Sequence, residues 1–271
     1  MTIVNSTEFI NSSKQFVQFT KTATAATLFG SYFSIESLAG VPTGGLAIDY
    51  GGIGLTSGLV PTDATGGLGV GYPAISNFGA NTVGYLSQIE FSNTVTGRLK
   101  LYDKLFIAGS YNSAGAVNQT LTSQPSFASR IVNGSYTGLQ LWCQVATNLS
   151  GVLTVNVTYT NENGTTGRVT STAIQGNSRR MFQFPLQAGD KGVQQITNVS
   201  SVTGGGGLYN ILIMRPLWSG RVRFANDLQL HTFKQTAMKQ VFQDSALTLI
   251  VQTDSNATTG LVDLEMLIVS G

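Results

Sequence analysis

Charged side chains are scarce in this sequence. Lysine, arginine, aspartate and glutamate make up 10% of the 271 residues, against roughly 25% in ordinary soluble domains. The formal net charge is only +2, and no dense basic patch is visible, which excludes a strong electrostatic footprint on nucleic acid. A polar but uncharged surface is unusual for a lone monomer, because charge normally prevents association. We therefore expect much of the surface to contact neighbours in an assembly.

Cysteine and histidine are nearly absent. The single cysteine, Cys143, excludes an intrachain disulfide and a cysteine-based zinc site within one chain. The single histidine, His231, would have to serve any Ser-His-acid triad, yet no Gly-x-Ser-x-Gly stretch supplies the nucleophile. We expect Cys143 to be a buried, inert thiol and His231 to lie at a surface or an interface.

The 13 acidic residues are spread thinly, and most aspartates stand near glycine, turn residues or strand edges. No segment has the closely spaced carboxylates of a regular calcium loop, and no pair is marked for glycoside hydrolysis. No apolar run approaches the ~18 residues of a membrane helix. We expect no enzyme activity, no catalytic residues, no cofactor, no metal site, and no nucleic-acid or membrane partner. The aspartates in question are Asp49, Asp63, Asp103, Asp190, Asp227 and Asp254.

Short alternating runs, by contrast, are abundant from about residue 82 onward. GLQLWCQVAT and GVLTVNVTYT are typical: they are rich in threonine, valine and leucine, and glycine or asparagine separates them from the next run. Many short strands at near-regular spacing indicate an antiparallel sandwich or a closed barrel. We predict an all-β protein with a jelly-roll-like antiparallel β-sandwich over residues 82–271.

Residues 1–81 have a different character. Glycine is so frequent over residues 41–80 that a regular packed element is not expected there. In TLFGSYFSIESLAG, residues 27–40, apolar side chains at spacings of three and four predict a short helix that ends at Gly40. We predict that residues 1–81 form an extended N-terminal arm that contains this helix and contacts another surface.

The best-defined local element is VNVTYTNENGTTGRVTSTAI, residues 155–174. Two alternating runs meet at an Asn-Glu-Asn-Gly corner, in which Asn163 and Gly164 supply the positive backbone angles that a tight hairpin needs. The corner has one carboxylate, that of Glu162, which is too little charge for tight calcium binding. We therefore predict a β-hairpin here, with Val155, Val157 and Tyr159 on its core face.

Five stretches, kept in one order across residues 31–217, together resemble a family of tailed-bacteriophage virion structural proteins. They are SYFSIESLAGVPTGG (31–45), GRLKLYDKLFIAGSY (97–111), LQLWCQVATNLSGVLTVNVTYTNENGTTGR (139–168), FPLQAGDKGVQQITNVS (184–200) and ILIMRPL (211–217). The resemblance implies a structural component of the virion, associated with the head. No catalytic residues belong to it.

On this basis we expect a non-enzymatic capsid decoration, or cement, protein on the capsid surface. Its partners would be the major capsid protein lattice and further copies of itself, with a trimer as the first expectation for three-fold positions. One alternative is a tail- or fibre-associated jelly roll that binds a host glycan; another is a glycan depolymerase, which needs two acidic residues ~5–10 Å apart in a cleft. The candidate stacking platforms for a glycan are Tyr102, Tyr111, Tyr136, Trp142 and Trp218.

Overall fold

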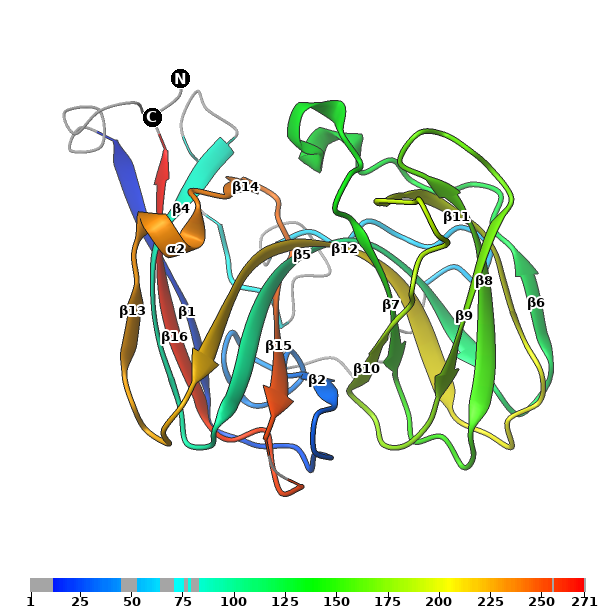
Figure 1. Cartoon of the computed structure of the whole chain (residues 1–271), viewed down its shortest axis with the longest axis horizontal. Coiled ribbons are helices and arrows are strands. Elements are labelled where there is room, and N and C mark those ends of the chain that lie inside the picture. The colour runs from blue at the N-terminus through cyan, green and yellow to red at the C-terminus, as the bar shows by residue number, and fades with distance from the viewer. Residues whose placement is uncertain are drawn as a thin grey trace.

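The computed structural model describes residues 12–44, 53–63, 71–75, 78, 83–254 and 256–270. Regular structure in these residues is almost entirely β (Figure 1). One α-helix of a single turn, α2 (Phe233–Thr236), and two 3-10 turns, η1 (Ala128–Arg130) and η2 (Val132–Gly134), are the exceptions. The predicted all-β class is confirmed. No helix in the described residues is long and apolar enough to cross a membrane.

The first of three β units is an outer sheet with the strand order β13–β4–β16–β1–β3, in which β14 also pairs with β4. All its pairs are antiparallel, and β1 runs alongside β16 from Ser13 opposite Ser270 to Thr20 opposite Asp263. We call it the first outer sheet. Its strands are β1 (Ser13–Lys21), β3 (Gly40–Val41), β4 (Val83–Asn93), β13 (Gln229–His231), β14 (Gln240–Phe242) and β16 (Val262–Ser270).

The second unit is a closed barrel with the strand order β10–β2–β15–β5–β12–β7, which we call the central barrel. Its two longest strands, β5 and β12, pair with each other from Gly97 opposite Val222 to Asn112 opposite Leu208, with three register shifts on the way. The strands are β2 (Tyr32–Ser34), β5 (Gly97–Asn112), β7 (Gln140–Val145), β10 (Arg180–Gln183), β12 (Leu208–Val222) and β15 (Leu247–Thr253).

The third unit is a four-stranded antiparallel sheet, β6–β11–β8–β9, which we call the second outer sheet. It contains the hairpin predicted over residues 155–174, now seen as β8 and β9. The strands are β6 (Val117–Thr120), β8 (Leu153–Asn161), β9 (Arg168–Ile174) and β11 (Val193–Ser201).

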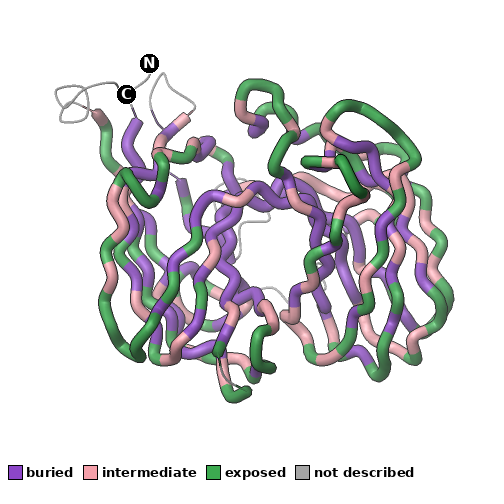
Figure 2. Tube along the Cα trace, in the orientation of Figure 1, coloured by how far each residue is buried: buried purple, intermediate pink, exposed green. Residues whose placement is uncertain are grey.

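The two outer sheets pack on opposite ends of the central barrel (Figure 1). One apolar core lies between the first outer sheet and the barrel, and a second core lies between the barrel and the second outer sheet. Strand β5 contributes to both: Leu99 and Leu101 pack in the first core, whereas Phe106 and Ala108 pack in the second. Figure 2 shows that most residues of the long strands that join the two halves are buried. The molecule is thus two β-sandwiches that share their inner strands.

The described strands therefore differ from the predicted jelly roll, since a jelly roll stacks two sheets and this chain forms three connected units. What caused the difference is the length of β5 and β12, which are 16 and 15 residues long. Each strand is long enough to contribute side chains to the core of one sandwich and then to the core of the other. Strand length of this kind follows from long-range pairing, which a local sequence pattern does not reveal.

The helix predicted over residues 27–40 is not present. The segment contains β2, a turn and the start of β3, and it pairs with β15 and β10. Two of the apolar residues behind the helical spacing, Leu28 and Phe29, are exposed, whereas the whole stretch from Phe33 to Glu36 is buried. Gly30 has a φ of 69°, a left-handed value that also interrupts a helix. Pairing with distant strands has overridden the local spacing.

The predicted arm is also corrected in part. Residues 13–21, which the sequence places in an extended arm, form β1, an integral strand of the first outer sheet. Val17 and Phe19 of this strand are buried in the core of that sheet. Residues 1–11, 45–52, 64–70, 76–77 and 79–82 lie outside the described residues. The domain boundary near residue 81 stays a prediction.

Candidate functional site

The hairpin corner at residues 161–164 is a four-residue turn. The N–H of Gly164 donates to the carbonyl of Asn161 at 3.0 Å, and the Asn161 N–H donates to the Thr165 carbonyl at 3.0 Å. Gly164 has a φ of 83°, whereas Asn163 is not among the residues with positive φ. The hairpin is confirmed, but Gly164 alone supplies the left-handed conformation at this corner. The expected core face is also confirmed, since Val155, Val157 and Tyr159 are fully buried.

A Gly164→Val variant is expected to lower the free energy of unfolding by about 1–2 kcal/mol, the cost of a side chain in the left-handed region. A Cβ at position 164 would meet only Gln194 Oε1, at 3.8 Å, so the loss reports backbone strain and no clash. Urea unfolding measures it, with the exposed neighbour Thr166→Val as the matched control. Equal stability of the two variants would contradict the turn assignment.

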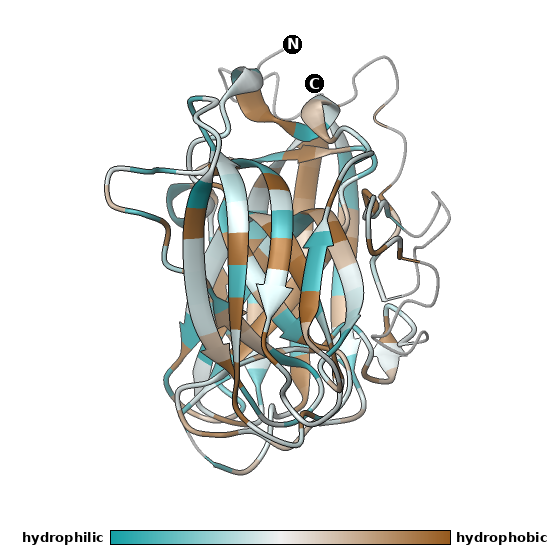
Figure 3. Cartoon of the chain, turned by 90° about the vertical axis from the view of Figure 1, so that its right-hand side faces the viewer, coloured by the Kyte–Doolittle hydropathy of each residue, from teal (hydrophilic) through white to brown (hydrophobic). Residues whose placement is uncertain are grey.

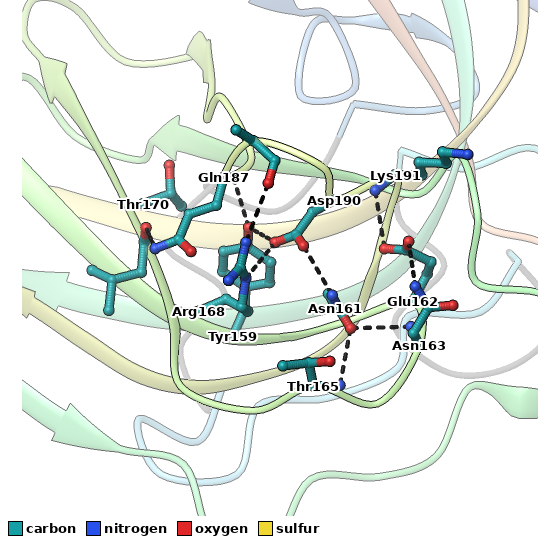
Figure 4. A network of polar contacts seen from close by, with 12 residues as sticks. Tyr159, Asn161, Glu162, Asn163, Thr165, Arg168, Thr170, Gln187, Asp190 and Lys191 are labelled. Atoms are coloured by element: carbon teal, nitrogen blue, oxygen red, sulfur yellow. Dashed lines mark hydrogen bonds and ion pairs between the residues drawn. The ribbon is translucent and has the colours of Figure 1, made fainter.

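Asp190 organises the polar network behind this corner (Figure 4). Its Oδ2 accepts the Tyr159 hydroxyl at 2.6 Å and the Arg168 Nε–H at 2.9 Å, and its Oδ1 accepts the Asn161 Nδ2–H at 2.9 Å. The Tyr159 hydroxyl in turn accepts the N–H of Gln187 at 2.9 Å. These bonds hold the loop that contains Asp190 against the turn between β8 and β9.

Glu162 makes the second link between the corner and the same loop. Its Oε2 accepts the N–H groups of Lys191 and Gly192 at 3.0 and 3.1 Å, and its Oε1 accepts the Asn163 Nδ2–H at 3.0 Å. The carboxylates of Glu162 and Asp190 therefore both accept hydrogen bonds from protein donors. Among the described residues no group of three or more His, Cys, Asp or Glu side chains is placed to hold a metal ion. The role of the corner is therefore structural: its hydrogen bonds connect the turn between β8 and β9 to the loop that contains Asp190.

Because Asp190 is ionised, the contribution of its hydrogen bonds to the stability of the fold depends on pH. Burial raises the pKa of the Asp190 carboxyl, but the hydrogen bonds from Arg168, Asn161 and Tyr159 outweigh it and lower the pKa to about 2. A carboxyl with a depressed folded-state pKa stabilises the fold above its unfolded-state pKa of about 4. That contribution is lost as the pH falls towards 2.

We therefore expect wild-type stability to fall more steeply between pH 4 and pH 2 than the stability of an Asp190→Asn variant. Thermal unfolding at a series of pH values measures the difference. Other buried carboxylates titrate in both proteins, so only the difference between the two curves reports Asp190. Parallel curves over this interval would show that Asp190 is not held as an ionised acceptor.

A cleft of about 500 Å³ lies next to the corner, between the start of β7 and the loop after β10. Its lining combines leucine, phenylalanine and proline residues with the polar residues Gln140, Gln183 and Lys191. Asp190 also borders the cleft, but its oxygens are already occupied by the network. No pair of neighbouring carboxylates lines this cleft, so the arrangement that a glycan depolymerase needs is not found there.

The exposed face of the second outer sheet carries a more extensive arrangement (Figure 3). Hydrophobic and hydrophilic positions alternate along its strands. The side chains on the outward face are mostly Thr, Asn and Ser, with Val169, Ala173 and Gln195 as exceptions, and none of them is charged. Strands in a sheet lie about 4.8 Å apart, so the groups form regular rows. One row contains Thr120, Asn198, Thr158 and Val169, and the next contains Asn118, Ser200, Asn156 and Ser171.

Most of the aromatic residues considered as glycan platforms are unavailable to a ligand at the surface. Tyr102 and Trp142 pack edge to face at 5.7 Å inside the central barrel, and Tyr111 is buried in the core beneath the second outer sheet. Trp218 is buried against Phe91. Only Tyr136 remains partly exposed. Core packing explains these rings better than stacking on sugar does.

Cys143 and His231 lie where the sequence predicts. Cys143 is fully buried in β7, and burial raises the pKa of its thiol, so it is an inert group. His231 is half-buried at the end of β13, where its Nδ1 accepts the indole N–H of Trp218 at 2.9 Å. Partial burial lowers the pKa of His231, so the ring is neutral at pH 7.

Two buried ionic groups near the central barrel were not found by sequence reasoning. The first is centred on Glu36, which accepts hydrogen bonds from Lys104 Nζ at 2.6 Å, Gln144 Nε2 at 2.8 Å and Thr248 Oγ1 at 3.0 Å. Burial raises the pKa of Glu36, but the charge of Lys104 and these hydrogen bonds bring it below its usual value. Glu36 is therefore ionised and paired inside the protein.

The second group is centred on Asp103, which was expected near a turn or a strand edge but lies in the middle of β5 and is fully buried. Its Oδ2 accepts Arg215 Nη2–H and the Ser245 hydroxyl at 2.9 and 3.0 Å, and its Oδ1 lies 3.4 Å from Arg130 Nη1. Burial raises the pKa of Asp103, and the two arginines more than compensate. One signal was available: Asp103 and Lys104 interrupt an otherwise apolar run, LYDKLFIAG.

Comparison with known proteins gives little similarity. No protein-family model matches the chain, and no curated protein matches it. Three structures of infectious bursal disease virus are similar at a very low level. The Gx strain structure is 8% identical over 95% of this chain and 80% of that chain, with a TM-score of 0.21. The Gt strain structure is 10% identical over 95% of this chain and 81% of that chain, with a TM-score of 0.17. The structure of the derived T=1 particles is 8% identical over 96% of this chain and 78% of that chain, with a TM-score of 0.16. Sequence identities and TM-scores this low do not support any conclusion about function.

Proposed function

We propose that this chain is a non-enzymatic structural protein of a tailed-phage virion that decorates the head. The observation behind the proposal is the outward face of the second outer sheet, whose rows consist mostly of Thr, Asn and Ser side chains and contain no charged residue. Such a face can hydrogen-bond to another protein without the large desolvation cost of burying charges. The ordered sequence phrases shared with phage virion proteins point in the same direction.

The chain also places its strongest ion pairs inside and leaves few outside. The groups around Glu36 and Asp103 are buried, whereas Arg221 with Asp254 is the one exposed ion pair in the part of the chain that the structure describes. Contacts made in many copies on a lattice gain strength by avidity, so each contact can be weak. A rigid β scaffold with uncharged polar faces suits that task.

The proposal is tested with heads prepared from a phage that lacks the gene. Purified protein is expected to bind these heads in many regularly spaced copies, visible in a cryo-EM reconstruction, and to be absent from tails. Density at the tail tip alone would contradict head decoration. A trimer at three-fold positions is the oligomer we propose, and native mass spectrometry of the purified protein measures it.

An Asn156→Lys variant tests which face makes the contact. Asn156 lies in the interior of the second outer sheet, between Ser200 and Ser171. A lysine there is expected to reduce head-bound copies by roughly tenfold or more, because burying one unpaired charge costs over about 1.4 kcal/mol. Thr24→Lys, at an exposed position outside this sheet, is the matched control. Equal binding of the two variants would remove this face from the proposal.

A further inference from the structure

Strand β13 leaves an apolar edge uncovered. It is the end strand of the first outer sheet, and within the described residues no strand pairs with its far side. In Figure 1 it lies at the rim of the molecule farthest from the second outer sheet. Leu228 and Leu230 are 61% and 51% exposed, and Phe224 and Phe233 on either side of the strand are 72% and 59% exposed. Four large apolar side chains within ten residues form a surface typical of an interaction site.

Three of the devices that protect an end strand, namely lysine, proline and a bulge, are missing from β13. Edge strands are normally shielded by lysine, proline or a bulge, because their free N–H and C=O groups can pair with another chain. The stretch Leu228–His231 contains neither lysine nor proline, and its pairing with β4 is regular from Gln229 to His231. The backbone is therefore ready to accept one more antiparallel strand.

We propose that β13 pairs with β13 of a second copy of this chain, antiparallel and with Gln229 on the two-fold axis. Leu228 then faces the partner's Leu230, and Asp227 faces the partner's His231. The first outer sheets of the two copies become one continuous sheet. This contact goes beyond head decoration and does not depend on it.

The chemistry of the strand selects this register. A two-fold axis perpendicular to a sheet keeps outward residues opposite outward residues, so a shift by one position is excluded. A shift by two in either direction would place one leucine opposite a polar residue, Leu228 opposite Thr232 or Leu230 opposite Asn226. In the chosen register the apolar pairs are Leu with Leu. The Nδ1 of His231 already accepts the Trp218 N–H, so the neutral ring carries its proton on Nε2 and can donate to the carboxylate of Asp227.

Because β13 has only three residues, the interface is small and its affinity is expected to be low. This further step rests on the proposed function: with the proposed trimer as the unit, each unit would carry three such edges, and the pairing would connect units across two-fold positions. Repetition then supplies the strength that one contact lacks.

Disulfide trapping tests the register. Directly opposite residues of an antiparallel pair have Cα atoms about 4.5–5.5 Å apart, within the range that a disulfide spans. A Gln229→Cys variant is expected to form a covalent dimer under mild oxidation, whereas Ser129→Cys, at an exposed position in η1, is not. The native Cys143 is buried and does not contribute. Equal dimer yields for the two variants would overturn the proposal.

A charge on the edge tests the contact itself. Leu230→Lys is expected to weaken self-association at least tenfold in analytical ultracentrifugation and to reduce the Gln229→Cys dimer yield in the double variant. Val202→Lys adds the same charge at an exposed site outside the first outer sheet and is expected to change neither. A Gln229→Cys yield that Leu230→Lys leaves unchanged would assign the dimer to chance collisions and overturn the pairing.

Discussion

Replacing Asp103 by alanine is expected to lower the free energy of unfolding by about 3–5 kcal/mol, the usual cost of leaving a buried charge without its partner. Asp103 is the only carboxylate within ion-pair distance of Arg130 and Arg215 in the part of the chain that the structure describes. Arg130 is fully buried, so it cannot turn outward to water. Urea unfolding followed by the fluorescence of the buried Trp142 and Trp218 measures the loss.

Asp254→Ala is the matched control for this prediction. It also removes one carboxylate from an arginine, Arg221, but both side chains are substantially exposed. Exposed pairs contribute about 0–1 kcal/mol, so this variant should stay close to wild type. A small loss for Asp103→Ala, similar to that of Asp254→Ala, would mean that water or another group compensates the two arginines.

Replacing Lys104 by methionine is expected to cost a similar amount at pH 7, about 3–5 kcal/mol, and to reverse a pH dependence. In the wild type, Lys104 and the hydrogen bonds hold the pKa of Glu36 below its usual value. Without Lys104 the burial of Glu36 becomes dominant, and its folded-state pKa should rise above the unfolded value. A carboxyl with a raised pKa favours the folded state at low pH and loses that contribution as the pH increases.

The deficit of Lys104→Met relative to the wild type should therefore be smaller at pH 4 than at pH 7. Unfolding curves at both values measure it. The Glu36→Gln change provides the control, because the double variant contains neither charge of the Lys104–Glu36 pair. We expect the double variant to lose clearly less stability than the sum of the two single variants. Additive losses and a pH-independent deficit would contradict a direct pairing.

The sequence predicted those features that depend on neighbouring residues. The alternation of Val155, Val157 and Tyr159 predicted a strand with one core face, and Gly164 predicted the turn, because both signals act within a few residues. The buried state of Cys143 was predicted from its place in a strand-like run, LQLWCQVAT. The same reasoning failed for residues 27–40, where exposed Leu28 and Phe29 contributed to a helical spacing that strand pairing overrode.

Features that depend on distant residues were not predictable in this way. Asp103 is paired with Arg130 and Arg215, and Lys104 with Glu36, across wide separations in the chain. A single sequence shows that charges interrupt an apolar strand but does not show which opposite charges meet them. The role of Asp190 was missed for the same reason, since its partners Tyr159 and Arg168 belong to the preceding hairpin.

The shared strands β5 and β12 also determine how the molecule would respond to mechanical load. Each strand enters the core of one sandwich and continues, without a chain break, into the core of the other. A force that pulls the two outer sheets apart would be carried along the covalent backbone of β5 and β12. Separation would therefore require both strands to be pulled out of one of the two cores, and opening the hydrogen bonds between β5 and β12 would not be sufficient. The two halves would therefore resist separation as one tensile element.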